Sequence, residues 1–547
     1  MERLLKGIIK FIKTILILVS ICMILLIAYI TMNDGNDISL DNINNKNKTS
    51  YSGITLNVLS SSENKDFEPY LIEFAESCDI NLNFEYAGNL DIIEKLNTSS
   101  SDYDIVWNSN SIWNYMLEDT SVLTDSISVS TNPVVFAVKK SKAQELGFMK
   151  DEIYLRDIVN EITAGNLKFS MANPTQTNSG ASTYLGMLSV FAGNPEVLKS
   201  EHINDENIKN LFVDFFMKLD RSSGSEDFLK EIILKDEYNA VATYESSIIN
   251  MNKILEKENK ETFYILYPVD GVSISDSPFA YIDNDNINKK EAYTEIKNYM
   301  LSSEAKNVLE SLGRRTWYGG ISSDVDKTVF NEGWGIDTEE YIVPIKYPHV
   351  DIIKEALNLY QNEFRKPMCI VFCLDYSGSM YGQNQADLIE AMEYVLIKEK
   401  AEQNYIQFSE KDRIIVIPFN NDVINVWGTY DGNKTEELVT KIRELKPSGS
   451  TNIYEPVAMG LEFLNGYDSN EYSKSVILMT DGESNRGSFI SLSDYYRQRG
   501  SNVPVYSIKF GEASESELEK INQLTNGKTF DGKDNLLKAF KEVRAYN

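Results

Sequence analysis

Five oxygen-bearing side chains fall in three separate segments of the second half of the chain. Asp375, Ser377 and Ser379 belong to MCIVFCLDYSGSM, Thr451 to GSTNIYEP and Asp481 to SVILMTDGESN. Hard divalent cations bind oxygen donors, and magnesium prefers a near-octahedral shell in which waters are kept. Two carboxylates and three hydroxyls, some acting through water, would leave one coordination position open. These residues predict a divalent-cation site, with magnesium preferred and calcium or manganese as alternatives.

A second group of polar side chains lies in the first half of the chain, close to short apolar segments. Hydroxyl and amide groups beyond the carboxyl ends of parallel strands are placed to bind a small ligand. The same residue types also cap helices and form turns. A purely structural role therefore remains the alternative for each candidate residue. The candidate ligand contacts are Ser60, Ser61, Asn108, Ser109, Thr177, Ser179 and Tyr244.

The sequence contains none of three common catalytic motifs, and its acidic residues outnumber its basic ones. No GxSxG elbow, HExxH pair or GxxxxGK[ST] loop occurs. The two histidines, His202 and His349, lie in an acidic segment and in a connector, and we therefore expect a protein that is not an enzyme. The formal net charge of −29 excludes a nucleic-acid binder that acts by neutralising phosphates.

The elements around the predicted cation site alternate between strand-like and helix-like segments. From residue 366 the pattern predicts strands at 368–375, 413–419, 475–482 and 503–511, with helices at 384–400, 435–445, 454–464, 490–499, 514–525 and 533–545. Such alternation predicts a doubly wound α/β domain whose strand ends meet at one edge. Residues 351–364 place apolar side chains at helical spacing and predict a helical connector that docks on its neighbour.

The DxSxS pattern, the distant Thr451 and the distant Asp481 resemble the metal-ion-dependent adhesion site of von Willebrand factor type A (VWA) domains. All five positions match in order. The resemblance implies a Rossmann-like fold and a divalent cation. It also implies a protein partner that binds through the metal, for which a carboxylate on the partner would suit.

Strand-like and helix-like segments also alternate from Ile54 onward, which predicts a parallel sheet covered by helices. The segments DYDIVWNSNSIW, VSTNPVVFAVKKSKAQELGF and MANPTQTNSGASTYLG together resemble a type 2 extracellular solute-binding protein. The resemblance implies two α/β lobes joined by crossing strands around a ligand cleft. The first crossing would lie at 129–138 and the return near 264–272, with a helix beginning near Ala181.

Residues 14–32 form an uncharged, mostly apolar run of 19 residues. At about 1.5 Å per residue the run would span roughly 28 Å, close to the thickness of a bilayer's hydrocarbon core. Basic residues precede it and acidic residues follow it, so the positive-inside rule places the chain after residue 33 outside the cell membrane. A cleaved signal peptide and a lipoprotein signal at Cys22 are the alternatives.

The sequence therefore predicts an α/β protein with an N-terminal transmembrane helix, a bilobal domain of the periplasmic-binding-protein type and a VWA domain. The expected divisions are a membrane anchor at 1–32, a flexible stalk at 33–51, the solute-binding-like domain at 52–345, a connector at 346–365 and the VWA domain at 366–547. The predicted function is ligand and protein binding at the cell surface. The alternative is a structural subunit in which the solute-binding fold serves only as an interaction module.

Overall fold

The computed structural model describes residues 51, 53–150, 152–219, 222–235, 238–316, 319–339, 342–509 and 515–532, together with 539, 541 and 543. Within those ranges, every helix is too short or too polar to cross a membrane. The anchor predicted at 14–32 and the stalk that follows it, up to residue 50, lie outside the described residues.

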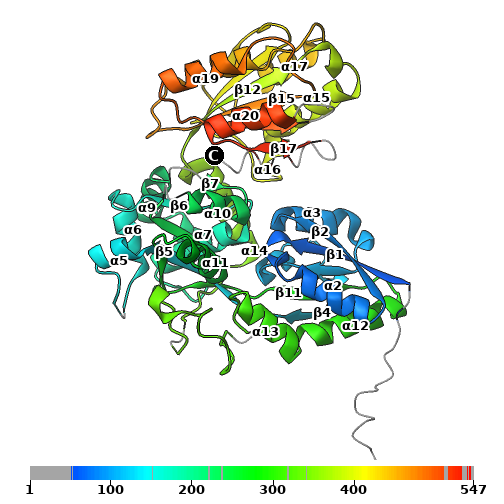
Figure 1. The fold of residues 1–547 in the computed structure, drawn as a ribbon, viewed down its shortest axis with the longest axis vertical. Coiled ribbons are helices and arrows are strands. Elements are labelled where there is room, and N and C mark those ends of the chain that lie inside the picture. The colour runs from blue at the N-terminus through cyan, green and yellow to red at the C-terminus, as the bar shows by residue number, and fades with distance from the viewer. Residues whose placement is uncertain are drawn as a thin grey trace, which may run out of the picture.

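The first lobe is built on a five-stranded sheet in the order β2-β1-β3-β11-β4 (Figure 1). Strands β1, β2 and β3 are parallel, whereas β11 runs antiparallel to both β3 and β4. The strands are β1 (Ile54–Ser61), β2 (Ile80–Ala87), β3 (Ile105–Trp107), β4 (Leu123–Ser128) and β11 (Pro278–Ile282). The helices include α2 (Glu68–Ser77), α3 (Asn89–Ser99), α4 (Ser111–Asn114), α12 (Ile287–Met300) and α13 (Ser303–Ser311).

The second lobe has a sheet in the order β10-β5-β8-β6-β7, with β9 also paired to β5. Its strands are β5 (Asn132–Lys139), β6 (Phe169–Ala172), β7 (Ser222–Ser223), β8 (Ala240–Tyr244), β9 (Phe263–Leu266) and β10 (Ser273–Ser275). Its helices are α5 (Lys140–Glu145), α6 (Leu155–Thr163), α7 (Asn178–Phe191), α8 (Ser200–Ile203), α9 (Glu206–Met217), α10 (Glu226–Leu234) and α11 (Glu245–Lys257). The resemblance to a solute-binding protein correctly implied two α/β lobes, but the predicted parallel sheet is mixed in both lobes, because β11 runs antiparallel to β3 and β5 runs antiparallel to β8.

Three short segments connect the lobes, and the third is 312–316, which follows α13 of the first lobe and brings Arg315 to Glu245 of the second. Residues 129–131 link β4 of the first lobe to β5 of the second, inside the predicted first crossing. The return differs from the prediction at 264–272, because β9 and β10 both still pair with β5 and the chain crosses only at 276–277. Helix α7 likewise begins at Asn178, three residues before the expected Ala181, since the Thr177 hydroxyl accepts a hydrogen bond from the Gly180 N–H and caps the helix.

The connector is a helix that packs against the second lobe. Helix α14 (Val350–Leu359) continues as a π-helical turn over Tyr360–Phe364. Tyr360 and Phe364 are buried, and their rings lie 5.9 Å and 6.2 Å from the ring of Tyr184 on α7. The connector therefore docks, as its apolar spacing predicted.

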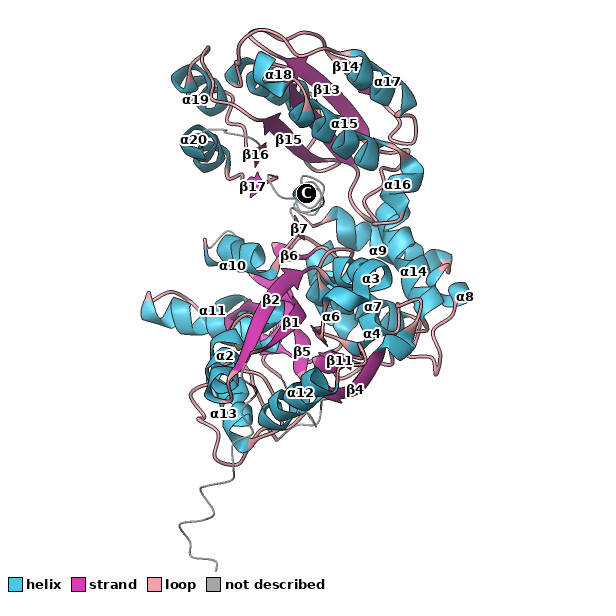
Figure 2. Ribbon diagram, turned by 90° about the vertical axis from the view of Figure 1, so that its right-hand side faces the viewer, coloured by secondary structure: helices cyan, strands magenta, loops and turns pink. Residues whose placement is uncertain are grey.

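The C-terminal domain has a six-stranded sheet in the order β14-β13-β12-β15-β16-β17 (Figure 2). Its strands are β12 (Met368–Asp375), β13 (Arg413–Phe419), β14 (Trp427–Thr429), β15 (Ser473–Thr480), β16 (Val505–Lys509) and β17 (Thr529–Asp531). Its helices are α15 (Gln383–Leu396), α16 (Lys398–Glu402), α17 (Glu436–Glu444), α18 (Tyr454–Asn465), α19 (Phe489–Gln498) and α20 (Glu515–Thr525). Most of the helix predicted at 533–545 lies outside the described residues.

The central strand β12 is buried along its whole length, because helices cover both faces of the sheet. Ile370 and Phe372 point into the core shared with α15 and α17, whereas Val371 and Cys373 point into the core shared with α18, α19 and α20. A strand with two buried faces is apolar at every position rather than at alternate ones, which explains the run MCIVFCL.

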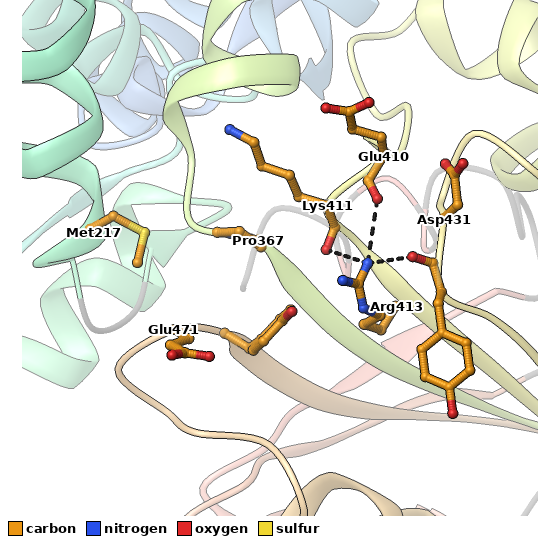
Figure 3. A pocket seen from close by; sticks show the side chains of 9 residues that line it. Met217, Pro367, Glu410, Lys411, Arg413, Asp431 and Glu471 are labelled. Atoms are coloured by element: carbon orange, nitrogen blue, oxygen red, sulfur yellow. Dashed lines mark hydrogen bonds between the residues drawn. The ribbon is translucent and has the colours of Figure 1, made fainter.

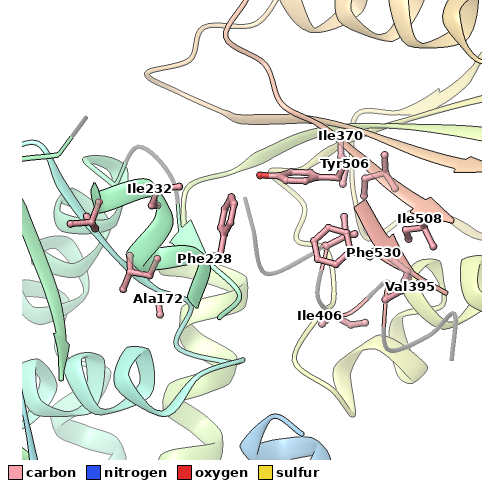
Figure 4. Close-up of a cluster of buried hydrophobic side chains, with 14 of the residues drawn as sticks. Ala172, Phe228, Ile232, Ile370, Val395, Ile406, Tyr506, Ile508 and Phe530 are labelled. Atoms are coloured by element: carbon pink, nitrogen blue, oxygen red, sulfur yellow. The ribbon is translucent and has the colours of Figure 1, made fainter. Parts of the chain in front are cut away.

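The C-terminal domain also packs on the second lobe. One continuous apolar cluster contains Phe228 of α10 together with Tyr506 of β16 and Phe530 of β17. Figure 4 shows the Phe228 ring pointing toward the two aromatic rings of the C-terminal sheet. The domain is thus fixed by side-chain packing as well as by the connector.

Candidate functional site

The five predicted cation ligands lie at the carboxyl edge of the C-terminal sheet. Asp375 is the last residue of β12 and Asp481 follows the last residue of β15. Ser377 directly precedes the 3-10 turn that follows β12, Ser379 lies within that turn, and Thr451 lies in the loop between α17 and α18. Since β12 and β15 are adjacent and parallel, both aspartates leave the sheet at the same edge.

Hydrogen bonds join the two aspartate segments directly. The Ser379 hydroxyl donates to Asp481 Oδ1 at 2.8 Å and lies 3.1 Å from the hydroxyl of Ser377. Asp375 Oδ1 accepts from the Ser377 N–H at 2.7 Å, and its Oδ2 accepts from the Thr480 hydroxyl at 2.7 Å. Four of the five predicted residues therefore belong to one network across two loops.

Main-chain bonds place Thr451 beside this network. The Ser448 N–H donates to the Tyr376 carbonyl at 2.8 Å, and the Gly378 N–H donates to the Gly449 carbonyl at 3.0 Å. The Thr451 carbonyl in turn accepts from the Asn485 N–H at 3.1 Å. A Cβ atom built on Gly482 would lie 3.6 Å from the Ser379 hydroxyl and 3.7 Å from the Thr451 hydroxyl. The structure thus brings all five residues together.

The electrostatics of this cluster suit a cation. Asp375 is fully buried, and burial, with a smaller contribution from the charge of Asp481, raises the pKa of its carboxyl group to about 6. Asp481 is 4 % exposed, while Ser379 is exposed, so the cluster opens to solvent on one side. Two nearby carboxylates without a basic neighbour in the network, flanked by hydroxyls, form the donor set that a hard divalent cation requires.

Hydroxyl groups supply most of these donors. Among the described residues no group of three or more His, Cys, Asp and Glu side chains could hold a metal ion. Sequence reasoning missed Thr480, which binds Asp375, and Asn384, whose amide donates to Asp481 Oδ2 at 2.5 Å. Thr480 could have been identified from its position immediately before Asp481. The last residues of adjacent parallel strands lie at the same edge of the sheet, so Thr480 is expected to lie near Asp375.

The predicted cleft residues are all buried, and those of the first lobe bond within it. The hydroxyls of Ser60 and Ser61 both donate to the Trp107 carbonyl, at 3.1 and 3.3 Å. The Ser109 hydroxyl donates to Asn89 Oδ1 at 3.0 Å. Asn108 donates to Asn114 Oδ1 at 2.6 Å, while its buried Oδ1 has no partner among the described residues.

In the second lobe, two predicted residues bind carboxylates that the sequence did not single out. The Ser179 hydroxyl donates to Glu226, and the Tyr244 hydroxyl lies 3.3 Å from Glu63 Oε1 of the first lobe. Burial raises the pKa of Glu63, and it raises that of Glu226 to about 7. The Tyr244–Glu63 bond and a bond of 2.7 Å from Trp113 Nε1 to Asn178 Oδ1 cross between the lobes.

A cavity of about 270 Å³ lies where both lobes meet the C-terminal domain. Of the seven predicted cleft residues, it is lined only by Thr177. Its other polar lining includes Glu63, Glu226, Lys528 and Lys541. The structure therefore moves the candidate ligand site outward, from the buried strand ends to the mouth of the cleft.

A second hollow, of about 500 Å³, lies at the amino edge of the C-terminal sheet, beside Met217 of the second lobe (Figure 3). Its most prominent charged group, Arg413, donates to the carbonyl of Glu410 at 3.4 Å and of Lys411 at 3.0 Å, and also to that of Tyr430. The guanidinium is therefore used to hold main-chain loops together, and we assign no binding role to this hollow.

Comparisons with known proteins match both halves of the chain. Residues 370–542 match the family model of the von Willebrand factor type A domain, and residues 56–315 match that of the bacterial extracellular solute-binding protein. The chain thus combines a solute-binding domain with a VWA domain, as the sequence motifs indicated.

Individual relatives match only part of the chain. Inter-alpha-trypsin inhibitor heavy chain H2 of Homo sapiens is 27 % identical over 170 residues, which are 29 % of this chain and 17 % of that protein. The uncharacterized protein YfbK of Escherichia coli is 26 % identical over 167 residues, 29 % of this chain and 27 % of that protein. The periplasmic binding protein AfuA of Actinobacillus pleuropneumoniae, solved with fructose-6-phosphate, aligns with a TM-score of 0.43 and 14 % identity over 57 % of this chain and 99 % of its own.

Proposed function

We propose that this chain is a membrane-anchored binding protein of the bacterial cell surface, with a divalent-cation-dependent protein-binding site in its VWA domain. The observation that carries the proposal is the meeting of five oxygen donors from three loops around the buried Asp375. Asp375, Ser377, Ser379, Thr451 and Asp481 would hold the cation, directly or through water. A bound magnesium ion would offer a coordination position to a carboxylate of the partner.

Calorimetric titration of the purified chain with magnesium tests this assignment. Asp375→Ala should weaken magnesium binding at least tenfold, which corresponds to about 1.4 kcal/mol. Glu390→Ala, which removes an exposed carboxylate of α15 in the same domain, serves as the matched control. Equal affinities in wild type and Asp375→Ala, or no binding at millimolar magnesium in the wild type, would remove the proposed metal site.

We further propose that the solute-binding domain takes a small polar molecule in the cavity at the mouth of its cleft. The support is the cavity itself, which is lined by charged and hydroxyl groups of both lobes. A thermal-shift panel of sugars, metal ions and oxyanions tests it, since a ligand at about 100 times its dissociation constant stabilises by about 2.7 kcal/mol. Gly88→Phe, which adds a ring at the cavity wall, should abolish the shift.

The second candidate function is a structural subunit whose solute-binding fold is only an interaction module. The bonds from Tyr244 to Glu63 and from Ser179 to Glu226 favour it, because these polar groups of the cleft already bind one another. The absence of any stabilising compound in the panel, together with intact magnesium binding, would select this alternative. We propose no enzymatic activity for either candidate function.

The proposed location follows from residues 14–32 and the basic residues before them. Protease added to intact cells from which the wall has been removed should digest the part of the chain after residue 33. Complete protection of that part, or a mature chain that begins after residue 30, would contradict the anchored arrangement.

A further inference from the structure

The VWA domain contributes two side chains to the wall of the cavity that otherwise belongs to the solute-binding domain. Lys528 precedes β17, and Lys541 lies in the C-terminal segment; both line the cavity. Lys541 is only 6 % exposed and pairs with two carboxylates of α3 in the first lobe, at 3.0 Å from Asp91 Oδ1 and 3.1 Å from Glu94 Oε2.

The Lys541 side chain stays protonated in this position. Burial alone would lower the pKa of its ammonium group, but Asp91, Tyr394 and Glu94 raise that pKa overall. A buried ammonium paired with two carboxylates is a costly contact to break, because the separated charges would remain in a poorly solvated position.

Different contacts fix the same domain to the second lobe. Phe228 of α10 lies in the apolar cluster that contains Tyr506 and Phe530, and the Lys528 ammonium lies 5.3 Å from the centre of the Phe228 ring. The Tyr405 carbonyl of the VWA domain accepts a hydrogen bond of 3.4 Å from the Thr175 hydroxyl. Thr175 belongs to the loop that carries Thr177 into the cavity wall.

The VWA domain therefore spans both lobes across the mouth of the cleft. In Figure 1, α20 and β17 lie on the side of the domain that faces the lobes. The lobes themselves are joined by three short crossings, at 129–131, 276–277 and 312–316. Segments of this kind absorb the backbone rotation when a two-lobed protein opens, and such an opening would separate α3 from the VWA domain.

We propose that the cavity is a binding site shared by both domains, in which Lys541 of the VWA domain holds the first lobe closed over a small polar molecule. Release of the occupant then requires the Lys541 pairs to break, so the occupancy of the cavity and the position of the VWA domain are coupled. This inference rests on the proposed ligand-binding role of the cavity, but its structural part can be tested without a ligand.

The test measures distances between domains in the full-length chain with Cys22 replaced by serine. One pair of spin labels, at Ser99→Cys on α3 and Glu519→Cys on α20, reports the first lobe against the VWA domain. A second pair, at Asn210→Cys on α9 and Glu519→Cys, reports the second lobe against the same domain. The described cysteines, Cys78, Cys369 and Cys373, are buried.

Lys541→Glu should lengthen and broaden the first distance and leave the second unchanged, because only the bond to the first lobe is lost. The exchange Lys541→Glu with Asp91→Lys should restore the wild-type distribution. Lys520→Glu, an exposed lysine of α20, is the matched control and should change neither distance.

Unchanged first distances in Lys541→Glu, or equal lengthening of both distances, would overturn the proposal. The second result would mean that the whole domain detaches. If Lys541→Glu opens the first lobe but no compound of the thermal-shift panel stabilises the chain, the clamp stands and the ligand-binding function fails.

Discussion

Replacement of Asp412 by asparagine should strongly destabilise the VWA domain. The Asp412 carboxylate is fully buried and accepts from Arg365 Nη1 at 3.0 Å and from Arg365 Nη2 at 2.5 Å. It also accepts from the main-chain N–H groups of Met368 and Ser409, both at 2.7 Å. One carboxylate thus joins the end of the connector, the start of β12 and the loop before β13.

The expected loss of unfolding free energy in Asp412→Asn follows from this geometry. Each oxygen of Asp412 accepts from one main-chain N–H and one guanidinium N–H, so the amide of Asp412→Asn must turn a donor toward two other donors. Arg365, whose side chain is 8 % exposed, would also retain a buried charge without its counterion. Loss of one partner of a buried ion pair costs about 3 to 5 kcal/mol. At about 2 to 4 °C per kcal/mol, the unfolding midpoint should fall by about 6 to 20 °C.

The destabilisation caused by Asp412→Asn should also depend on pH. Burial alone would raise the pKa of Asp412, but the charge and hydrogen bonds of Arg365, with the two main-chain donors, hold it below its ordinary value. A carboxyl group with a lowered pKa stabilises the fold above its unfolded pKa of about 3.9, and this stabilisation is lost as the pH falls toward the folded pKa. Wild type and Asp412→Asn should therefore differ most near neutral pH and converge below about pH 4.

Differential scanning calorimetry of the full-length chain between pH 3 and pH 7 measures both quantities. Glu410→Gln, which neutralises an exposed carboxylate two residues away, is the control and should leave the midpoint unchanged. A fall of less than about 2 °C in Asp412→Asn at pH 7, or an equal fall in the control, would refute the reasoning.

Three further substitutions test other parts of the structure. Phe228→Ala should cost about 3 to 5 kcal/mol of unfolding free energy, and limited proteolysis should then release the VWA domain from the second lobe; an unchanged cleavage rate would count against the packing contact. Glu226→Gln should flatten the fall in thermal midpoint that wild type shows as the pH rises from about 4.5 to about 7, because a carboxyl group with a raised pKa stabilises the fold fully below its unfolded pKa and loses that stabilisation as the pH rises to the folded pKa; parallel pH profiles would contradict this. Gly180→Ala should lower the yield of folded protein, since its Cβ would lie 2.4 Å from the Ala172 carbonyl oxygen, and a wild-type circular dichroism melt would exclude the clash.

The sequence predicted best those features that depend on residues close together along the chain. The strand predicted at 413–419 coincides with β13, and the DxSGS segment begins with the last residue of β12. In both places an apolar run, IIVIPF or MCIVFCL, is followed at once by polar residues, so the composition marks where the strand ends. The short strands β14 and β17 escaped prediction because three residues carry no readable periodicity.

Long-range partners could not be read from the sequence. Glu63 and Glu226 are two of 82 acidic residues, and only the folded chain brings them beside Tyr244 and Ser179. Lys541 and Asp91 lie 450 positions apart. The segment of β9 was identifiable as extended, but its pairing with β5, and that of β10 with β5, depends on the sheet register, which displaced the predicted return between the lobes.

The placement of β12 determines how the VWA domain would carry a mechanical load. The strand begins next to the connector and ends at Asp375, so a pull on a partner bound at the proposed metal site would run along the strand axis. Its neighbours pair with it in parallel over Cys369–Asp375 and Met368–Leu374. The hydrogen bonds on both sides would be loaded in shear and share the tension, instead of opening one after another from an end. The central strand is thus oriented to transmit force applied at Asp375 to the connector without peeling out of the sheet.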